Sequence, residues 1–317
     1  MSKAIVCTGV MMLYEEGHIQ LGDPISKYIP EFAEPRVFAE GDETVPAKSE
    51  ITILQLLTHT SGLSYGFDQR LQPLAEKAGL MDHPTALTTG EIVRGIARLP
   101  LDHHPGEAWT YGTSIDVLGH LIEVLSDMRL DTFLSERIFV PLGMVDTGFF
   151  VPQEKRHRLM PNYISTENGF VRMSKDPHSL GTMNLTEDIV CQESQSFHMG
   201  GGGLASTLHD YVRFAQTLLN GGQLDGTRLL GRKTVDRMTI NSIGDLEVNV
   251  AADLQGDKMG LGLGIRGDRG RHGGLESIGS FGWAGGFGSV FWVDPAEDLV
   301  GVVMSQAGLG NFVDFMN

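Results

Sequence analysis

The first residues of the chain include a lysine that could take part in acid–base chemistry. Lys3 stands at the start of an apolar stretch, Ala4 to Glu16, that is predicted to form a helix. A lysine on the first turn of a buried helix is unusual. It is expected at the end of a Ser-x-x-Lys motif, where the serine lies one turn upstream on the same face. Here that serine would stand one position ahead of Met1. The alternative is that Lys3 is a solvated residue at a frayed helix end.

A tyrosine ahead of a predicted helix is the second candidate. Tyr111 lies in the run Trp109-Thr-Tyr-Gly-Thr113, directly before a helix expected from about Ser114 to Ser126. The positive end of a helix dipole favours a phenolate, and a nearby lysine favours it further. A tyrosine in that setting could take the proton of a serine hydroxyl. The alternative is that Tyr111 is a buried packing residue.

A glycine-rich segment near the end of the chain is the third candidate. Residues 281–289 read Phe-Gly-Trp-Ala-Gly-Gly-Phe-Gly-Ser and lead into Phe291-Trp-Val-Asp-Pro295. Glycines at the lip of a strand let a ligand approach the backbone closely, and a backbone N–H there could bind a developing oxyanion. A glycine-rich β-bulge with a packing tryptophan is the alternative.

Two other serines are possible nucleophiles, and neither is favoured. Gly62-Leu-Ser64-Tyr-Gly66 matches the G-x-S-x-G pattern, but that elbow needs a buried strand before it, whereas a short helix is expected here. Ser2 could act after removal of Met1, but it is adjacent to Lys3 rather than one helical turn away. The histidines follow no catalytic pattern and are expected in loops or on the surface: His59, His103, His104, His198, His209 and His272.

The middle of the chain is mostly helical. Thr113 and Asp116 resemble a capping box for the helix that follows Tyr111. A second strong helix follows a run of four glycines, with Thr207 as its cap and Asp210 completing the box. After about residue 245 the pattern changes to strands, at 260–266, 289–293 and 299–304, and Asp294-Pro295 marks a hairpin between the last two.

The composition excludes several classes of protein. The net charge of −16 and the lack of a basic run argue against a nucleic-acid partner. Cys7 and Cys191 form no disulfide framework, and no metal-binding motif is present, so neither a metal nor another cofactor is expected. No signal peptide or membrane-spanning segment is evident, which argues against a membrane partner and favours the cytoplasm. Nothing in the sequence indicates an oligomeric state.

The three candidate motifs together, in this order and spacing, resemble those of the serine β-lactamase and penicillin-binding superfamily. The resemblance is strongest to class C-like members, the β-lactamase-fold esterases called family VIII carboxylesterases. It spans nearly the whole chain. The stretches that carry it are Met11-Met-Leu-Tyr-Glu-Glu-Gly17, Asp23-Pro-Ile-Ser-Lys-Tyr-Ile-Pro30, Leu56-Leu-Thr-His-Thr-Ser-Gly62, Val117-Leu-Gly119, Pro141-Leu-Gly-Met144, Gly200-Gly-Gly-Gly-Leu-Ala-Ser-Thr207 and Phe291-Trp-Val-Asp-Pro295.

The resemblance implies an α+β fold of the β-lactamase/transpeptidase type. An antiparallel sheet flanked by helices would be formed by residues 1–20 and 245–317, and a mostly helical domain by residues 21–244. The active-site cleft would lie between them. A sheet with so few residues after its last strand would leave an edge uncovered, so the sheet domain is expected to be incomplete at both ends.

The resemblance also implies roles for individual residues. Lys3 matches the motif lysine that assists proton transfer, and Tyr111 matches the tyrosine base of acylation and deacylation. Trp283-Ala284-Gly285 occupies the place of the Lys-Thr-Gly strand motif and would contact the substrate. Gly286 would supply one oxyanion N–H, and the serine itself would supply the other.

Two departures from the family pattern favour esters over β-lactams. Penicillin-recognising members have a lysine that holds the β-lactam carboxylate, and Trp283 replaces it here. They often have Tyr-x-Asn, and Thr113 stands in place of the asparagine. Both changes favour a neutral small-molecule substrate. The expected activity is hydrolysis of short-chain carboxylic esters through an acyl-serine.

The third departure concerns the nucleophile. The serine of the motif is absent from the sequence, so this chain by itself is expected to have little turnover. We expect that an upstream segment holds the serine, an early helix and two strands. The alternative is a non-catalytic member of the same fold that binds a ligand or peptide.

Overall fold

The computed structural model describes residues 1–41, 43–66, 69–80, 86–166, 169–173, 178–180, 183–185, 189–192, 195–248, 256–267 and 275–308. Its helices are α1 (Ser2–Glu15), α2 (Ile53–Leu57), α3 (Leu71–Lys77), α4 (Thr89–Ile96), α5 (Ser114–Ser126), α6 (Leu130–Leu134), α7 (Val140–Leu142), α8 (Leu208–Leu219) and α9 (Arg232–Met238). Shorter 3₁₀ turns are formed by Ile25–Lys27, Pro30–Phe32, Gln153–Arg158 and Ile189–Cys191, and a π-helical turn by Ser135–Phe139.

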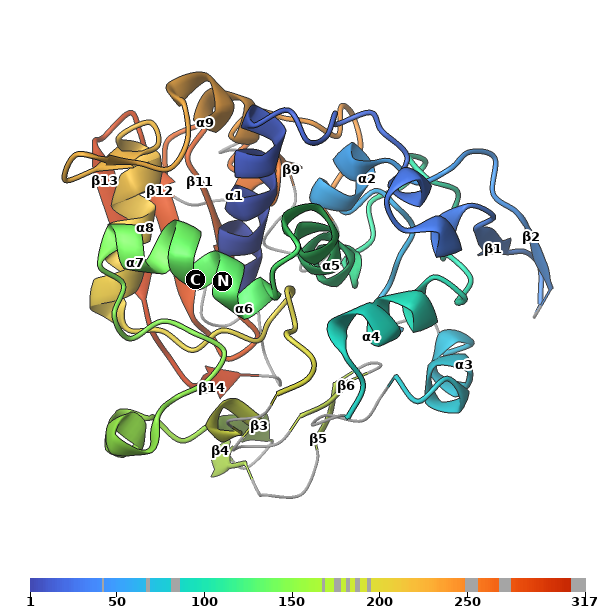
Figure 1. The fold of residues 1–317 in the computed structure, drawn as a ribbon, viewed down its shortest axis with the longest axis horizontal. Coiled ribbons are helices and arrows are strands. Elements are labelled where there is room, and N and C mark those ends of the chain that lie inside the picture. The colour runs from blue at the N-terminus through green and yellow to red at the C-terminus, as the bar shows by residue number, and fades with distance from the viewer. Residues whose placement is uncertain are drawn as a thin grey trace.

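The strands are β1 (Arg36–Phe38), β2 (Thr44–Pro46), β3 (Tyr163–Thr166), β4 (Gly169–Arg172), β5 (His178–Leu180), β6 (Met183–Leu185), β7 (Gln223–Leu224), β8 (Thr227–Arg228), β9 (Lys258–Met259), β10 (Gly264–Ile265), β11 (Phe281–Ala284), β12 (Val290–Asp294), β13 (Leu299–Val303) and β14 (Ala307–Gly308). The main sheet has the order β13-β12-β11-β10-β9, with antiparallel neighbours throughout. Helix α8 packs against β12 and β13, and α1 lies beside the sheet (Figure 1). The predicted α+β class is confirmed.

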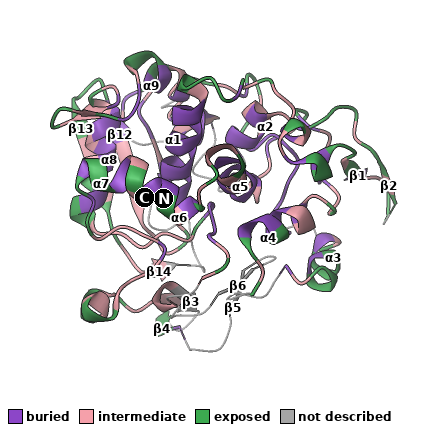
Figure 2. Ribbon diagram, viewed as in Figure 1, coloured by how far each residue is buried: buried purple, intermediate pink, exposed green. Residues whose placement is uncertain are grey.

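Helix α1 forms the centre of the molecule, between the main sheet and the helices α2 and α5 (Figure 1). Every residue from Ser2 to Leu13 is buried, and the helix is almost entirely purple in Figure 2. A helix that is apolar on all sides needs partners on all sides. α5 and α6 pack against α1, and Gly262, just before β10, contacts Cys7. The helix ends at Glu15, one residue before the predicted Glu16, and Gly17 just beyond it has a φ of +82°.

One face of the main sheet packs against α8. Trp283 of β11 pairs with Phe291 of β12, and both side chains are buried on the face that α8 covers. Tyr211 of α8 packs its ring 5.0 Å from that of Phe291. The hairpin predicted at Asp294-Pro295 joins β12 to β13. Of the predicted strand 260–266, only β10 forms, because Gly262 has a φ of +78° that ends the extended backbone.

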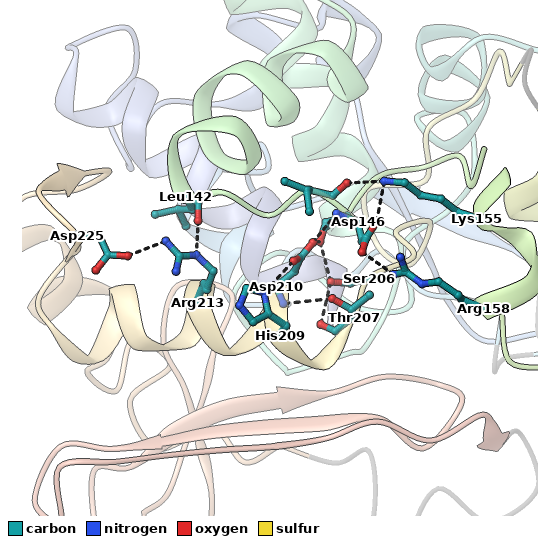
Figure 3. A network of polar contacts seen from close by, with 12 residues as sticks. Leu142, Asp146, Lys155, Arg158, Ser206, Thr207, His209, Asp210, Arg213 and Asp225 are labelled. Carbon is teal, nitrogen blue, oxygen red and sulfur yellow. Dashed lines mark hydrogen bonds and ion pairs between the residues drawn. The ribbon is translucent and has the colours of Figure 1, made fainter. Parts of the chain in front are cut away.

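The N-terminus of α8 is fastened to the preceding part of the chain by a buried carboxylate (Figure 3). Thr207 caps the helix as predicted, accepting the Asp210 N–H at 3.2 Å. The other half of the predicted box is wrong, because Asp210 turns away from Thr207. It accepts the N–H of Asp146 at 2.7 Å and the hydroxyl of Thr147 at 2.9 Å. Together with the bridge from Gly148 to Ala205, these bonds join residues 146–148 to the chain that follows the run Gly200–Gly203.

The helical side of the fold begins with well-capped helices. Thr52 and Gln55 form a complete capping box on α2, and Thr88 and Glu91 form another on α4. The division into domains at 21–244 stays a prediction, although α8 of that segment packs on the sheet. Among the described helices, none is both long enough and apolar enough to cross a bilayer.

Candidate active site

Lys3 is buried at the start of α1, with 4% of its surface exposed. Its Nζ donates to the carbonyl oxygen of Gly201 at 2.6 Å and to the hydroxyl of Tyr65 at 3.1 Å. The alternative of a solvated lysine at a frayed end is therefore wrong. A buried ammonium needs hydrogen-bond acceptors to offset its lost hydration, and Lys3 has them from two segments far along the chain.

The aromatic ring of Tyr111 also lies beside the Lys3 ammonium. The Lys3 Nζ lies 4.6 Å from the centre of the Tyr111 ring. Tyr111 comes from the segment just before α5, as predicted, and its ring is surrounded by other rings. The distances between ring centres are 5.1 Å to His59, 5.4 Å to Tyr65, 5.8 Å to Trp283 and 6.1 Å to Trp109. This packing holds the Tyr111 ring in one place, directly before the N-terminus of α5.

The capping box predicted from Thr113 and Asp116 is wrong. Thr113 stands at the N-cap position of α5, but its side chain makes no capping bond. The carboxylate of Asp116 crosses instead to the glycine run, where Oδ1 accepts the Gly201 N–H at 2.9 Å. Asp116 is 3% exposed. An acidic residue on the first turn looks like a cap in the sequence, and nothing local indicated its real partner.

Gly201 is the point where these groups meet. A Cβ atom on Gly201 would lie 2.5 Å from the Tyr65 hydroxyl, 2.9 Å from Asp116 Oδ2 and 3.3 Å from Lys3 Nζ. Only a residue without a side chain fits there. Tyr65 and Asp116 are thus site residues that sequence reasoning missed. The available signal for Tyr65 was the tyrosine beside Ser64 in the rejected Gly62–Gly66 elbow.

The glycine-rich segment after β11 lies at the start of α1. The backbone nitrogen of Met1 lies 3.3 Å from the Ala284 oxygen, and a Cβ atom on Gly285 would lie 3.2 Å from the same nitrogen. Gly285 and Gly288 are joined by a turn hydrogen bond of 3.0 Å. Gly286 between them is exposed, and its N–H donates to no acceptor in the part of the chain that the structure describes. That N–H is therefore free to bind a substrate oxygen.

The other predicted contact residue, Trp283, is buried beside Tyr111. Its ring also covers Gly264 of β10, where a Cβ atom would lie 3.0 Å from the indole. The structure thus brings Lys3, Tyr111 and Trp283 together, with Ala284 and Gly285 at the first residue of the chain and Thr113 at the helix end behind Tyr111. Their catalytic and binding roles stay predictions.

The rival nucleophiles have other partners. The Ser64 hydroxyl accepts the N–H of Gly66 at 3.1 Å within a loop, and no strand precedes it. The Ser2 hydroxyl accepts the N–H of Leu204 at 3.2 Å. Burial raises the pKa of the Cys7 thiol to about 12, so Cys7 stays protonated.

Two of the histidines lie in loops, as predicted, but they are buried there. His59 is completely buried and His198 nearly so. His272 lies outside the described residues. Burial holds the pKa of His59 well below its usual value of 6.5, and the positive charge of Lys3 acts in the same direction. His59 is therefore a neutral ring at physiological pH.

The electrostatics of the site favour a charged Lys3. Burial on its own would lower the pKa of Lys3, but Tyr111, Tyr65 and Asp116 outweigh it and raise the pKa above its usual value. Burial raises the pKa of Asp116, which the Gly201 N–H and Lys3 oppose. A cation beside a tyrosine, next to an unused backbone N–H, can move a proton and stabilise an oxyanion. Within the described residues, no three His, Cys, Asp or Glu side chains cluster as metal ligands would.

Known proteins resemble the chain over almost its full length. The family described as beta-lactamase matches residues 1–316. Protein Rv1367c of Mycobacterium tuberculosis is 32% identical, over 96% of this chain and 76% of its own. Esterase EstB of Burkholderia gladioli is 27% identical, over 94% of this chain and 74% of its own. The structure of "EstCE1, a hydrolase with promiscuous acyltransferase activity" superposes with a TM-score of 0.81 at 24% identity, covering 98% of this chain and 80% of that one.

Proposed function

Because the chain belongs to the beta-lactamase family, we propose that it is a serine hydrolase that cleaves short-chain carboxylic esters through an acyl-serine intermediate. One observation carries the proposal: the Lys3 ammonium and the Tyr111 ring, 4.6 Å apart, lie beside the glycine-rich end of β11. The relative named esterase EstB supports an ester as the substrate.

The proposed nucleophile is a serine one position ahead of Met1. A Ser-x-x-Lys motif ending at Lys3 requires it there. The contact of 3.3 Å between the Met1 nitrogen and the Ala284 oxygen supports this position, because the residue ahead of Met1 would then adjoin the glycine turn. The Gly286 N–H would face the carbonyl group that such a serine attacks.

The reaction would proceed in two halves. The Tyr111 phenolate takes the proton of the serine hydroxyl as the serine oxygen bonds to the ester carbonyl carbon, and the resulting oxyanion accepts the N–H of Gly286. When the intermediate collapses, the alkoxide leaves with the proton from Tyr111. Water then repeats the sequence on the acyl-serine and releases the acid. The Lys3 ammonium stabilises the phenolate in both halves.

Trp283 and Thr113 support esters over β-lactams. By the family resemblance, Trp283 takes the place of a lysine that would bind a substrate carboxylate, and its buried indole has no positive charge to offset one. Thr113 lacks the amide of the asparagine that binds a drug side chain. A neutral ester needs neither group.

The test uses the protein with the residues that its gene encodes immediately ahead of Met1. It is expected to hydrolyse p-nitrophenyl butyrate much faster than the β-lactam nitrocefin. A fluorophosphonate probe should form an adduct that peptide mass mapping places on the serine three residues before Lys3, and replacing that serine by alanine should abolish adduct and turnover. An adduct on Ser64 or Ser2, or a residue other than serine at the encoded position, would overturn the proposal.

A further inference from the structure

Lys3, Tyr65, Asp116 and Gly201 form a buried cluster behind Tyr111. Lys3 donates to Gly201 O and to the Tyr65 hydroxyl. Asp116 accepts the Gly201 N–H through Oδ1, and its Oδ2 lies beside the Tyr65 hydroxyl, since a Cβ atom on Gly201 would be 2.9 Å from the one and 2.5 Å from the other. The four residues come from α1, from the loop after α2, from α5 and from the glycine run ahead of α8. Such a cluster is built into the fold rather than formed by flexible side chains.

The acceptors around Lys3 determine which groups in this cluster donate. The Gly201 carbonyl is an acceptor only, and the Tyr65 oxygen accepts from Lys3, so the Tyr65 proton can point toward the nearby Asp116 carboxylate. Both contacts therefore require N–H donors on Lys3, and the third N–H of an ammonium remains on the side of Tyr111.

Asp116 also balances the charge of Lys3. The titratable side chains that face Lys3 are Tyr65 and His59 from the loop after α2, Tyr111 from the segment before α5, Asp116 from α5, and Cys7 from α1. Burial raises the pKa values of Tyr65 and Cys7 and lowers that of His59, so these three side chains are neutral at physiological pH. Apart from Tyr111, which the proposed reaction uses as the base, Asp116 is the acidic side chain among the described groups around Lys3, and Lys3 and the Gly201 N–H favour its ionised form. A buried ammonium without such a partner would lose its proton readily.

We propose that Asp116 is a positioning residue that, through Tyr65 and Gly201, keeps Lys3 protonated and directed at Tyr111. This inference rests on the proposed function, because it assigns the base to Tyr111 and excludes Lys3 from that role. Lys3 then acts as a fixed cation that stabilises the Tyr111 phenolate. Asp116 itself touches neither substrate nor reacting atoms.

The decisive variant is Asp116→Asn. The amide oxygen still accepts the Gly201 N–H, so the backbone stays in place, but the negative charge is gone. An opposite charge at this range changes a pKa by about 1–3 units. The Lys3 amine should therefore lose its proton at a pH lower by about one unit or more. The alkaline limb of kcat/KM for p-nitrophenyl butyrate should move to lower pH by the same amount, with kcat reduced more than KM is changed.

An activity-independent measurement separates this inference from the proposed function. The ¹³Cε resonance of Lys3, assigned by its absence in Lys3→Met, reports the protonation of the amine directly by NMR. A downward shift of its titration in Asp116→Asn supports the inference even if no ester is hydrolysed. An unshifted titration in a folded Asp116→Asn protein overturns it even if the esterase activity is confirmed.

Two further variants control for a nonspecific effect of losing a buried carboxylate and for a failure of Asp116→Asn to fold. Asp210→Asn removes another buried first-turn carboxylate that bonds a remote backbone N–H but is not among the groups that act on the Lys3 pKa, and it should lower Tm without moving the Lys3 titration. An equal shift in that variant would overturn the inference. If Asp116→Asn does not fold, Tyr65→Phe decides instead. It removes the hydroxyl between Lys3 and Asp116 but keeps the ring, so a downward shift of the Lys3 titration supports the inference and no shift overturns it.

Discussion

The Lys3 ammonium lies 4.6 Å from the centre of the Tyr111 ring, although the two residues are in widely separated parts of the chain. A cation over an aromatic face is attracted to the ring and also lowers the cost of ionising its hydroxyl. The contact joins the start of α1 to the start of α5, and the packing of these two helices maintains it. Any rearrangement of either helix would therefore change the acid–base chemistry of the site.

Removing the Tyr111 hydroxyl should abolish most of the activity while sparing the fold. In Tyr111→Phe the ring keeps its contacts with His59, Trp109 and Trp283. A lost general base reduces kcat by about 10²–10⁴-fold. We expect a decrease in this range for p-nitrophenyl butyrate hydrolysis, with Tm close to that of the parent protein.

The control for this variant is Tyr14→Phe, which removes a hydroxyl at the far end of α1. It should leave kcat unchanged within about twofold. If Tyr111→Phe retained full activity with an intact fold, Tyr111 would not be the base.

Gly201 should tolerate no side chain. In Gly201→Ala the new methyl group would lie 2.5 Å from the Tyr65 hydroxyl and 2.9 Å from Asp116 Oδ2, so the side chains around Lys3 must move apart. Overpacking of this kind costs about 1–3 kcal/mol of unfolding free energy. Urea denaturation should detect this loss, and kcat should fall because Lys3 is no longer held.

The neighbouring glycine provides a matched control. Gly202 is exposed, and the nearest atom to a Cβ there is the flexible Met199 sulfur at 3.2 Å. Gly202→Ala should change the unfolding free energy by less than about 0.5 kcal/mol. Equal effects of the two variants would show that the whole run, rather than Gly201, is sensitive.

The parts of the site that could be predicted from the sequence are those with strong local patterns. An apolar stretch predicted α1 and with it the position of Lys3. A helical stripe predicted α5, which begins and ends at the expected residues, and so located Tyr111 at a helix N-terminus. The predicted strands at 289–293 and 299–304, with Asp294-Pro295 between them, located the hairpin of β12 and β13.

Asp116 and Tyr65 could not be predicted, because their roles depend on contacts between distant segments. An aspartate on the first turn of a helix forms a cap in one case and crosses to another segment in the next. The local pattern Thr-x-x-Asp, present at both Asp116 and Asp210, does not distinguish the two cases. Asp210 illustrates this, since Thr207 caps α8 as predicted but the carboxylate bonds to Asp146. Only the packing of α5 and α8 against their neighbours decides which partner is available.

The stability of the protein should fall with decreasing pH below about 6.5. The pKa of His59 is held well below 6.5 by burial, so the unfolded chain binds a proton in this range and the folded protein does not. The contribution of His59 to stability is therefore present above pH 6.5 and is lost as the pH falls, by up to about 1.4 kcal/mol per pH unit. Urea unfolding between pH 5 and pH 7.5 would measure this slope.

Substitution of His59 tests the assignment. His59 has a φ of +56°, which asparagine tolerates, so His59→Asn is the suitable variant. It should be less stable overall but should have a smaller slope. Burial also lowers the pKa of His198, so His198 should account for the part of the slope that remains. The pKa values of Asp23 and Asp146 are about 2, so these carboxylates affect stability only below about pH 4. An unchanged slope in His59→Asn would show that other groups control the acid instability.

The buried carboxylate of Asp210 should contribute far more to the free energy of unfolding than a carboxylate on the surface does. Asp210→Ala leaves the part-buried N–H of Asp146 without its acceptor, and the hydroxyl of Thr147 keeps only its bond to Ser206 (Figure 3). An unsatisfied buried donor costs about 1–3 kcal/mol, and we expect a loss in this range from urea denaturation.

The matched control is Asp236→Ala, since Asp236 is 47% exposed and forms ion pairs with Arg232 and Lys233 on α9. Such pairs contribute less than about 1 kcal/mol. A loss in Asp210→Ala no larger than that in Asp236→Ala would mean that the start of α8 is held by its packing rather than by this carboxylate.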